Sequence, residues 1–204
     1  MVIEKHICRP VGCVTALVAN GIIAVLVLMS PPGMAQGTST AVPSASQYVK
    51  GSLCTQPDQV VFSCPLARNG KIVSMCAAGN ASPHTFYYVF GRPHAVEMRY
   101  PNDPAASNDG FLHSILGYPG GTGGYAYSFV NNGIKYIVYS VSGKFGYESD
   151  GVIVQKSGSL FALADMECSK GKMIETSSDS LTDETLKWRV DNELNGRALP
   201  DTKK

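Results

Sequence analysis

One dipeptide constrains the fold of this chain most strongly: Asn69-Gly70, which lies between two short runs of apolar and β-branched residues, Val60–Cys64 and Lys71–Ala77. Asn-Gly accepts the positive φ angles of a type I′ turn, and the twist of that turn matches the strands that it joins. The sequence therefore predicts an antiparallel β-hairpin at this position.

The same pattern of short strands and turn residues continues along the chain. It predicts further strands at 85–90, 95–100, 125–130, 134–141, 152–156 and 159–163, the last two pairs joined by Asn131-Asn132-Gly133 and Ser157-Gly158. Successive hairpins of this kind can close a sheet on itself and remove its exposed edges. We therefore predict an all-β fold, an antiparallel meander of about eight strands that forms a strongly curved sheet or a small barrel.

The first 35 residues have the pattern of an export signal. Basic residues at positions 5 and 9 precede an uncharged run from Val11 to Met29, and Pro31-Pro32-Gly33 ends that run. Gly33 and Ala35 are the small residues that a signal peptidase accepts, so we predict cleavage before Gln36 and a periplasmic or secreted protein. The alternative is an uncleaved N-terminal anchor, because the uncharged run approaches the length that crosses a bilayer.

The remaining chain divides into three parts. Residues 36–52 are interpreted as a flexible leader, 53–170 as the antiparallel β domain, and 171–204 as a C-terminal tail. The tail contains apolar residues at helical spacing, with Ser180 or Thr182 in a position to cap the helix. These apolar residues are Leu181, Leu186, Val190 and Leu194, with Trp188 nearby. The tail is therefore predicted to form a short amphipathic helix that packs on the sheet.

Four cysteines remain after removal of the signal, namely Cys54, Cys64, Cys76 and Cys168. An even number in an exported domain indicates two disulfides rather than a zinc site. If Asn69-Gly70 is a two-residue loop, Cys64 lies opposite Met75, and Cys64 and Cys76 then point to opposite faces of the sheet. We therefore prefer Cys54–Cys64 with Cys76–Cys168, although a β-bulge at the turn would change this parity.

Charge excludes one class of partner. The formal net charge is +1, and removal of residues 1–35 reduces the basic residues from 17 to 15 and the acidic residues from 16 to 15. A neutral domain lacks the basic surface that nucleic-acid binding requires. After cleavage no stable membrane span is expected.

The chain offers few residues for catalysis or for binding a metal. The predicted mature chain has three histidines, His84, His94 and His113. A metal site formed by His94, His113 and Asp109 is conceivable, but isolated loop histidines rarely have such a role. We therefore assign no catalytic residue, no metal ligand and no cofactor.

The glycine-rich segment Gly117–Tyr125 lacks the Gly-x-Gly-x-x-Gly pattern of dinucleotide sites and the Lys-Ser or Lys-Thr of a P-loop. It is interpreted as a flexible loop between two strands. Tyrosines at loop rims often contact partners. Tyr118, Tyr125 and Tyr127 are therefore the predicted binding residues.

Several strand segments resemble those of a family of uncharacterised exported proteins of proteobacteria. The segments are Val61–Cys64, Asn69–Ala77, Tyr87–Gly91, Val96–Pro101 and Gly151–Val154. The resemblance covers most of 60–168, and its motifs are structural, so it implies no activity. The export signal, the strand pattern and the late cysteine are also similar to periplasmic lysozyme inhibitors of the membrane-bound C-type group. Those inhibitors carry a Ser-Gly-x-x-Tyr loop motif; the nearest stretch here, Ser142–Tyr147, has its tyrosine one position later.

Two functions from different classes remain. The first is a non-catalytic binding or inhibitor-like protein of the periplasm or exterior, whose tyrosine-bearing loops recognise a protein or glycan of the cell envelope. The second is a hydrolase that acts on envelope material through dispersed histidine and aspartate residues. The scarcity of histidine and the absence of a nucleophile motif favour the first.

Overall fold

A computed structural model of the chain describes residues 47–103 and 106–202. The predicted signal peptide, its cleavage site and residues 36–46 of the predicted leader lie outside the described residues. Within the described part, no helix has both the length and the apolar character needed to cross a membrane.

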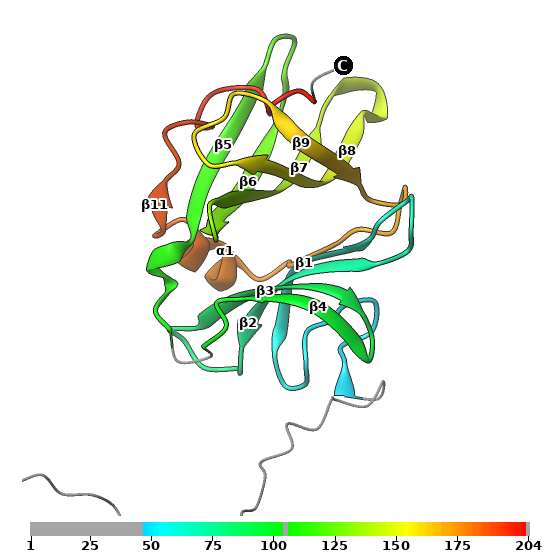
Figure 1. Cartoon of the computed structure of the whole chain (residues 1–204), viewed down its shortest axis with the longest axis vertical. Coiled ribbons are helices and arrows are strands. Elements are labelled where there is room, and N and C mark those ends of the chain that lie inside the picture. Colours follow the sequence, from blue (N-terminus) through cyan, green and yellow to red (C-terminus); the bar gives the residue numbers. More distant parts are fainter. Residues whose placement is uncertain (1–46, 104–105, 203–204) are drawn as a thin grey trace, which may run out of the picture. The chain divides into compact units, whose positions relative to one another are not determined.

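The strands form two separate sheets that lie face to face (Figure 1). The first sheet has the order β10 (Ile174–Glu175), β1 (Gln59–Pro65), β2 (Ile72–Ala78), β3 (Thr85–Arg92) and β4 (Ala95–Tyr100). The second has the order β11 (Arg189–Val190), β5 (Leu112–Tyr118), β6 (Thr122–Asn131), β7 (Ile134–Ser142), β8 (Glu148–Lys156) and β9 (Ala162–Glu167). Neighbouring strands are antiparallel, apart from the parallel pair β11 and β5.

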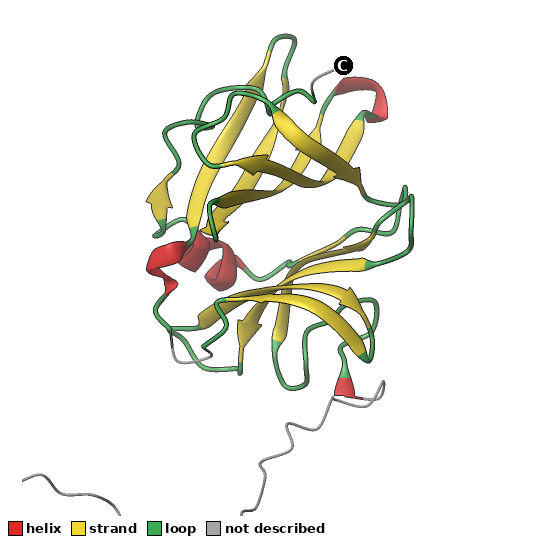
Figure 2. Ribbon diagram, in the orientation of Figure 1, coloured by secondary structure: helices red, strands yellow, loops and turns green. Residues whose placement is uncertain are grey.

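Among the described residues, and apart from Gln47 at the start of the described chain, helical structure is confined to three short segments (Figure 2). These are α1 (Asp179–Thr185) and the 3-10 turns η2 (Asn108–Gly110) and η3 (Lys144–Gly146). The predicted all-β class with a short C-terminal helix is therefore confirmed, with the curved chain of hairpins arranged as two layers rather than as a closed barrel. Seven of the predicted strands correspond to β1–β4 and β6–β8, and the eighth, predicted at 159–163, overlaps only the start of β9. The strands β5, β10 and β11 were not predicted.

The hairpin at Asn69-Gly70 forms with a longer loop than predicted. Cys64 lies opposite Val73 rather than Met75. Farther from the turn, β1 has a bulge between Val60 and Phe62. The loop is longer because Leu66 turns into the core and its backbone bridges to Cys168. The register moves by two residues, so the parity is kept, and Cys64 and Cys76 do lie on opposite faces of the first sheet.

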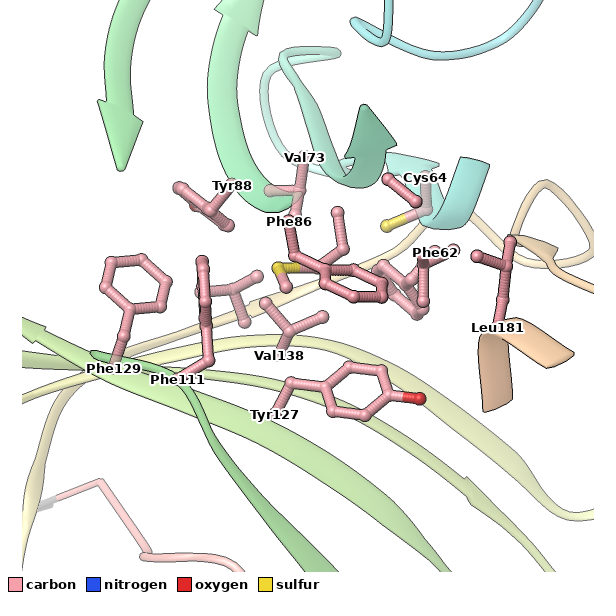
Figure 3. Close-up of a cluster of buried hydrophobic side chains, with 14 of the residues drawn as sticks. Phe62, Cys64, Val73, Phe86, Tyr88, Phe111, Tyr127, Phe129, Val138 and Leu181 are labelled. Carbon is pink, nitrogen blue, oxygen red and sulfur yellow. The ribbon is translucent and has the colours of Figure 1, made fainter. Parts of the chain in front are cut away.

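The main core lies between the two sheets (Figure 3). Apolar side chains of the first sheet pack against apolar side chains on the side of the second sheet, and Leu181 of α1 packs at the border. The first group contains Phe62, Val73, Phe86 and Tyr88, and the second contains Phe111, Tyr127, Phe129 and Val138. Aromatic rings contribute much of this contact; Phe129 stacks on Tyr100 with a centroid distance of 4.3 Å. Burial of such large apolar side chains is the dominant stabilising contribution to a fold of this kind.

Two further clusters cover the outer faces of the sheets. Residues 47–58 lie over the first sheet and pack Tyr48 and Leu53 against Tyr87 and Val89. The C-terminal segment lies over the second sheet, where Leu194 packs against Ile137, Tyr139 and Ile153. The described residues 47–52 of the predicted leader are therefore packed on the domain, and the tail supplies both β10 and β11 to the sheets.

Two disulfides form, but the preferred pairing was wrong. Cys54 bonds Cys76, which ties the N-terminal segment to the outer face of β2. Cys64 bonds Cys168, which joins β1 of the first sheet to the end of β9 in the second. Cys64 lies on the face of the first sheet that is directed toward the second sheet, whereas Cys76 lies on the opposite face, which the N-terminal segment covers.

The C-terminal helix ends earlier than its apolar spacing predicted. Leu181 is buried, whereas Leu186 and Val190 are 51% and 41% exposed. After α1 the chain turns to run beside β5, and the backbone N–H of Asp191 donates to the carbonyl of His113 (2.8 Å). Pairing with the sheet edge therefore replaces the last helical turns in this segment.

Candidate functional site

The glycine-rich segment is an ordered hairpin, so the prediction of a flexible loop was wrong. β5 ends at Tyr118 and β6 begins at Thr122, which leaves only three residues for the turn. A Cβ atom at Gly124 would collide with the carbonyl oxygen of Ser140 on β7. This close approach of two backbones, rather than loop flexibility, explains a glycine at that position.

The three tyrosines predicted as binding residues occupy different environments. Tyr127 is 8% exposed, lies in the core between the sheets and shares a hydrogen bond of 3.2 Å with the hydroxyl of Thr185. Tyr125 lies on the same face, with its ring 5.0 Å from that of Tyr127. Tyr118 lies on the opposite face of the sheet, and its hydroxyl accepts a hydrogen bond from the backbone N–H of Leu199. The structure therefore brings Tyr125 and Tyr127 together and separates them from Tyr118.

Tyr125 and Tyr127 line a small cavity of about 100 Å³ beside α1. His113, Glu175 and Thr185 also line it. Burial raises the pKa of Tyr127, and burial together with the charge of Glu175 raises the pKa of Tyr125. Both hydroxyls therefore stay protonated at neutral pH and do not act as bases.

Beyond this cavity, the inner face of the second sheet carries small and polar residues in place of core residues. Ser140 and Asp150 lie in the same row as Tyr125, and Gly123, Ser142 and Glu148 form the next row. Ser142 and Glu148 are exposed, and Ser140 and Asp150 are partly exposed. The first sheet therefore does not cover this end of the inner face, which is open to solvent.

A larger cavity of about 340 Å³ lies at the β8 side of this open end. Residues 146–150 and 167–171 line it, and these include three acidic residues (Glu148, Asp150 and Glu167) and one basic residue, Lys170. Among the described residues, none of the three carboxylates forms an ion pair. Burial raises the pKa of Asp150, a hydrogen bond with Ser140 lowers it, and the charge of Glu148 raises it again, so the net shift is upward.

The β7–β8 hairpin presents two aromatic side chains beside this cavity. Phe145 is fully exposed at the tip and Tyr147 is 53% exposed. The backbone of Phe145 has φ 61° and ψ 26°, a left-handed conformation that bulky residues rarely adopt. The backbone N–H of Gly143 donates to the carbonyl of Tyr147 (2.9 Å) and closes the turn. Strained backbone of this kind is found preferentially at functional sites.

We call this region the open-end groove: the 340 Å³ cavity together with Phe145, Tyr147, Ser142 and Ser140. It combines exposed aromatic rings with hydroxyl and carboxylate groups, which are the groups that bind polar ligands and protein side chains. Its residues were not among the predicted binding residues, although Ser142–Tyr147 is the stretch nearest to the Ser-Gly-x-x-Tyr motif of the lysozyme inhibitors. One sequence signal pointed to an exposed turn at this place: Phe145 lies between Gly143 and Gly146, just after a predicted strand.

The histidines do not form a common site. His94 lies in the turn between β3 and β4, and His113 lies on β5, where its Nδ1 is 2.8 Å from the carbonyl oxygen of Trp188. Asp109 accepts a hydrogen bond from the hydroxyl of Ser107. Across 47–103 and 106–202, no group of three or more histidine, cysteine, aspartate or glutamate residues is arranged to hold a metal ion.

His84 has a role that the sequence did not reveal. Its Nδ1 lies 3.0 Å from Oε1 of Glu184 in α1, and its backbone N–H donates to Oε2 of the same carboxylate (2.8 Å). Its Nε2 lies 3.0 Å from the side-chain amide of Gln59. Both His84 and Glu184 are buried, and this pair links α1 to the residue that precedes β3 of the first sheet.

Comparisons with known proteins found no matching family model, no matching curated protein and no matching solved structure.

Proposed function

We propose that this chain is an exported, non-catalytic binding or inhibitor-like protein that recognises a protein or glycan of the cell envelope through the open-end groove. Two disulfides within one domain support an oxidising compartment, such as the periplasm or the exterior. The proposal keeps the function expected from the sequence but moves the contact residues to Phe145 and Tyr147, because Tyr127 is buried in the core.

The exposed Phe145 is the observation that carries the proposal. A phenylalanine that buries nothing in its own chain contributes no hydrophobic stabilisation, and its left-handed backbone is unfavourable. Burial of the Phe145 ring in a partner explains both the exposed side chain and the unfavourable backbone, since aromatic side chains often contribute most of the binding energy at interfaces. The adjacent cavity and its hydroxyl and carboxylate groups supply the polar contacts that fix orientation.

The test compares the double variant Phe145→Ala/Tyr147→Ala with the native protein in binding to purified cell-wall sacculi and, separately, to solubilised envelope proteins. We expect binding in one fraction to weaken by about 1 to 3 kcal/mol in the variant, with no change in thermal midpoint. Leu160→Ala is the matched control, because Leu160 is 85% exposed at the β8–β9 turn, away from the groove. Equal binding by the double variant, or equal loss in the control, contradicts the proposal.

A hydrolase acting on envelope material is the second candidate, and one observation favours it. Burial raises the pKa of Asp150, which lies near Glu148 at the open end of the sheet, and a carboxyl with a raised pKa is the kind of group that glycoside hydrolases use as a general acid. Release of soluble fragments from sacculi that disappears in Asp150→Asn and persists in Asp109→Asn would support this candidate over the binding function.

A further inference from the structure

β9 is an edge strand whose outer side is only partly covered. It pairs with β8 alone in the second sheet. The N–H of Cys168 donates toward β8, to the carbonyl of Asp150 (2.8 Å), whereas the carbonyl of Glu167 accepts from Ala67 on the other side (2.9 Å). Backbone groups alternate in direction along an antiparallel strand. The N–H and C=O of Asp165 therefore point away from β8.

The uncovered part of this edge is short and bounded at both ends. At one end the backbone N–H of Ala162 donates a hydrogen bond to the carbonyl of Asp201 (3.0 Å). At the other end the backbone N–H of Ala67 donates a hydrogen bond to the carbonyl of Glu167. Between these contacts, and on the side of β9 that faces away from β8, no strand of the described residues pairs with 163–166. An edge with unpaired backbone groups is a template for pairing with another extended chain.

Two adjoining cavities, of about 500 and 440 Å³, lie along this uncovered edge. Arg68, Ala164, Met166 and Glu167 line both of them. Leu163, Asp165 and Thr202 line only the first, and Leu66 and Asn69 line only the second. A strand added to an edge directs alternate side chains to opposite faces of the sheet. Side chains of an added strand would therefore enter cavities that already exist.

The two faces of the edge differ in chemistry. Ala164 and Met166 point to the inner face, where the second cavity is lined largely by apolar side chains together with Leu66. Asp165 and Glu167 point to the outer face, and among the described residues neither forms an ion pair, although Arg68 lines the same cavity. The outer face therefore favours a basic side chain, and the inner face favours an apolar one.

From this geometry we propose that the edge of β9 binds an extended peptide segment of a protein partner as an added β-strand, with apolar and basic side chains in alternation. Main-chain hydrogen bonds to Asp165 supply affinity, and the two cavities select the alternate side chains. The site shares Glu167 with the open-end groove but does not use Phe145 or Tyr147, so it does not depend on the function proposed for that groove.

The test uses the full mature protein labelled with ¹⁵N and the capped peptide Val-Lys-Val-Lys-Val-Lys. We expect amide shifts confined to 163–167 and slower hydrogen exchange at the N–H of Asp165. Asp165→Asn/Glu167→Gln should weaken binding by tenfold or more, because both side chains are exposed and the substitution removes charge without loss of volume. Phe145→Ala/Tyr147→Ala should bind the peptide as the native protein does.

Two control peptides separate strand addition from charge attraction. Val-Lys-Pro-Lys-Val-Lys keeps the charge but loses one main-chain donor, and Val-Glu-Val-Glu-Val-Glu keeps strand propensity but reverses the charge. Both should bind at least tenfold more weakly than the first peptide. Equal binding of either peptide, shifts centred outside 163–167, or dimerisation of the free protein through β9 in sedimentation experiments would overturn the proposal.

Discussion

Lys135 of β7 and Asp191 of the C-terminal segment form an ion pair of 2.7 Å between side chains that are only 4% and 2% exposed. The hydroxyl of Ser128 donates to the same carboxylate oxygen (2.5 Å), and Glu193 accepts a second bond from Lys135 at 2.6 Å. This network holds the C-terminal segment against the outer face of the second sheet.

Lys135→Met should lower the free energy of unfolding by about 3 to 5 kcal/mol, because it leaves the carboxylate of Asp191 buried without its cation. Lys71→Met is the matched control. Lys71 also lies 2.7 Å from a carboxylate, that of Glu97, but these side chains are 28% and 43% exposed. The control should therefore cost less than about 1 kcal/mol. Urea denaturation measures both values, and equal losses would show that burial does not determine the difference.

The two disulfides should differ in their contribution to stability. Cys64–Cys168 closes a sequence separation of 104 residues and Cys54–Cys76 one of 22. The chain-entropy relation predicts losses of about 5 kcal/mol for Cys64→Ala/Cys168→Ala and about 3 kcal/mol for Cys54→Ala/Cys76→Ala. Denaturant unfolding of the two double variants tests this order. The reverse order would mean that packing of the N-terminal segment outweighs loop closure between the sheets.

Much of the strand pattern could be predicted from local turn chemistry. Asn132 and Gly133 adopt the positive φ angles, 50° and 76°, that the Asn-Gly signal demands, and β6 and β7 pair directly across them. Such signals act between neighbours in the sequence, so they survive without knowledge of the fold. The opposite orientation of Cys64 and Cys76 followed for the same reason, from alternation along paired strands.

Features that depend on the third dimension could not be predicted in this way. The partners of Cys64 and Cys76 depend on which face of the first sheet meets the second. β5 was missed because its end merges with a glycine-rich segment that local rules assign to a loop. Phe145 resembles a core residue in the sequence, and only the position of its hairpin tip shows that it is exposed.

Acid should weaken the link between α1 and the first sheet. Burial raises the pKa of Glu184. Hydrogen bonds from Ser82 and His84 and the charge of His84 lower this pKa by more than burial raises it, so the pKa lies below the ordinary value of 4.5. A carboxyl whose folded pKa is depressed contributes stability that is fully present above the unfolded pKa and is lost as the pH falls through the folded value. Glu184→Gln should therefore cost about 1 to 3 kcal/mol at pH 7.

The difference between native protein and Glu184→Gln should shrink as the pH falls below 4.5, because the native carboxyl then becomes protonated in both states. Unfolding free energies measured from pH 7 to pH 3 check this. A difference that stays constant over the whole range would mean that the charge of Glu184 contributes nothing to the link.

Gly124→Ala should destabilise the second sheet, because the new methyl group would meet the carbonyl of Ser140 within a paired strand. Overpacking of this kind costs about 1 to 3 kcal/mol. Gly117→Ala is the control from the same hairpin, since the nearest atom to a Cβ there is the carbonyl oxygen of Gly196 at 4.0 Å and its φ is not positive. It should be neutral within about 0.5 kcal/mol. Thermal unfolding of both variants distinguishes a close backbone approach from a flexible loop, which would tolerate alanine at either position.

Tyr127 should behave as a core residue, in contrast to its assignment from the sequence as a binding residue. Tyr127→Ala removes a ring that contacts Trp188 at a centroid distance of 5.3 Å, and it should cost about 3 to 5 kcal/mol. Tyr127→Phe keeps the ring and loses only the hydrogen bond with Thr185, so it should cost about 1 kcal/mol. Tyr147→Ala, at a 53% exposed position, should change stability by less than about 0.5 kcal/mol. If Tyr127→Ala instead unfolds at the native midpoint, the ring does not pack between the sheets, and its role at a binding surface regains support.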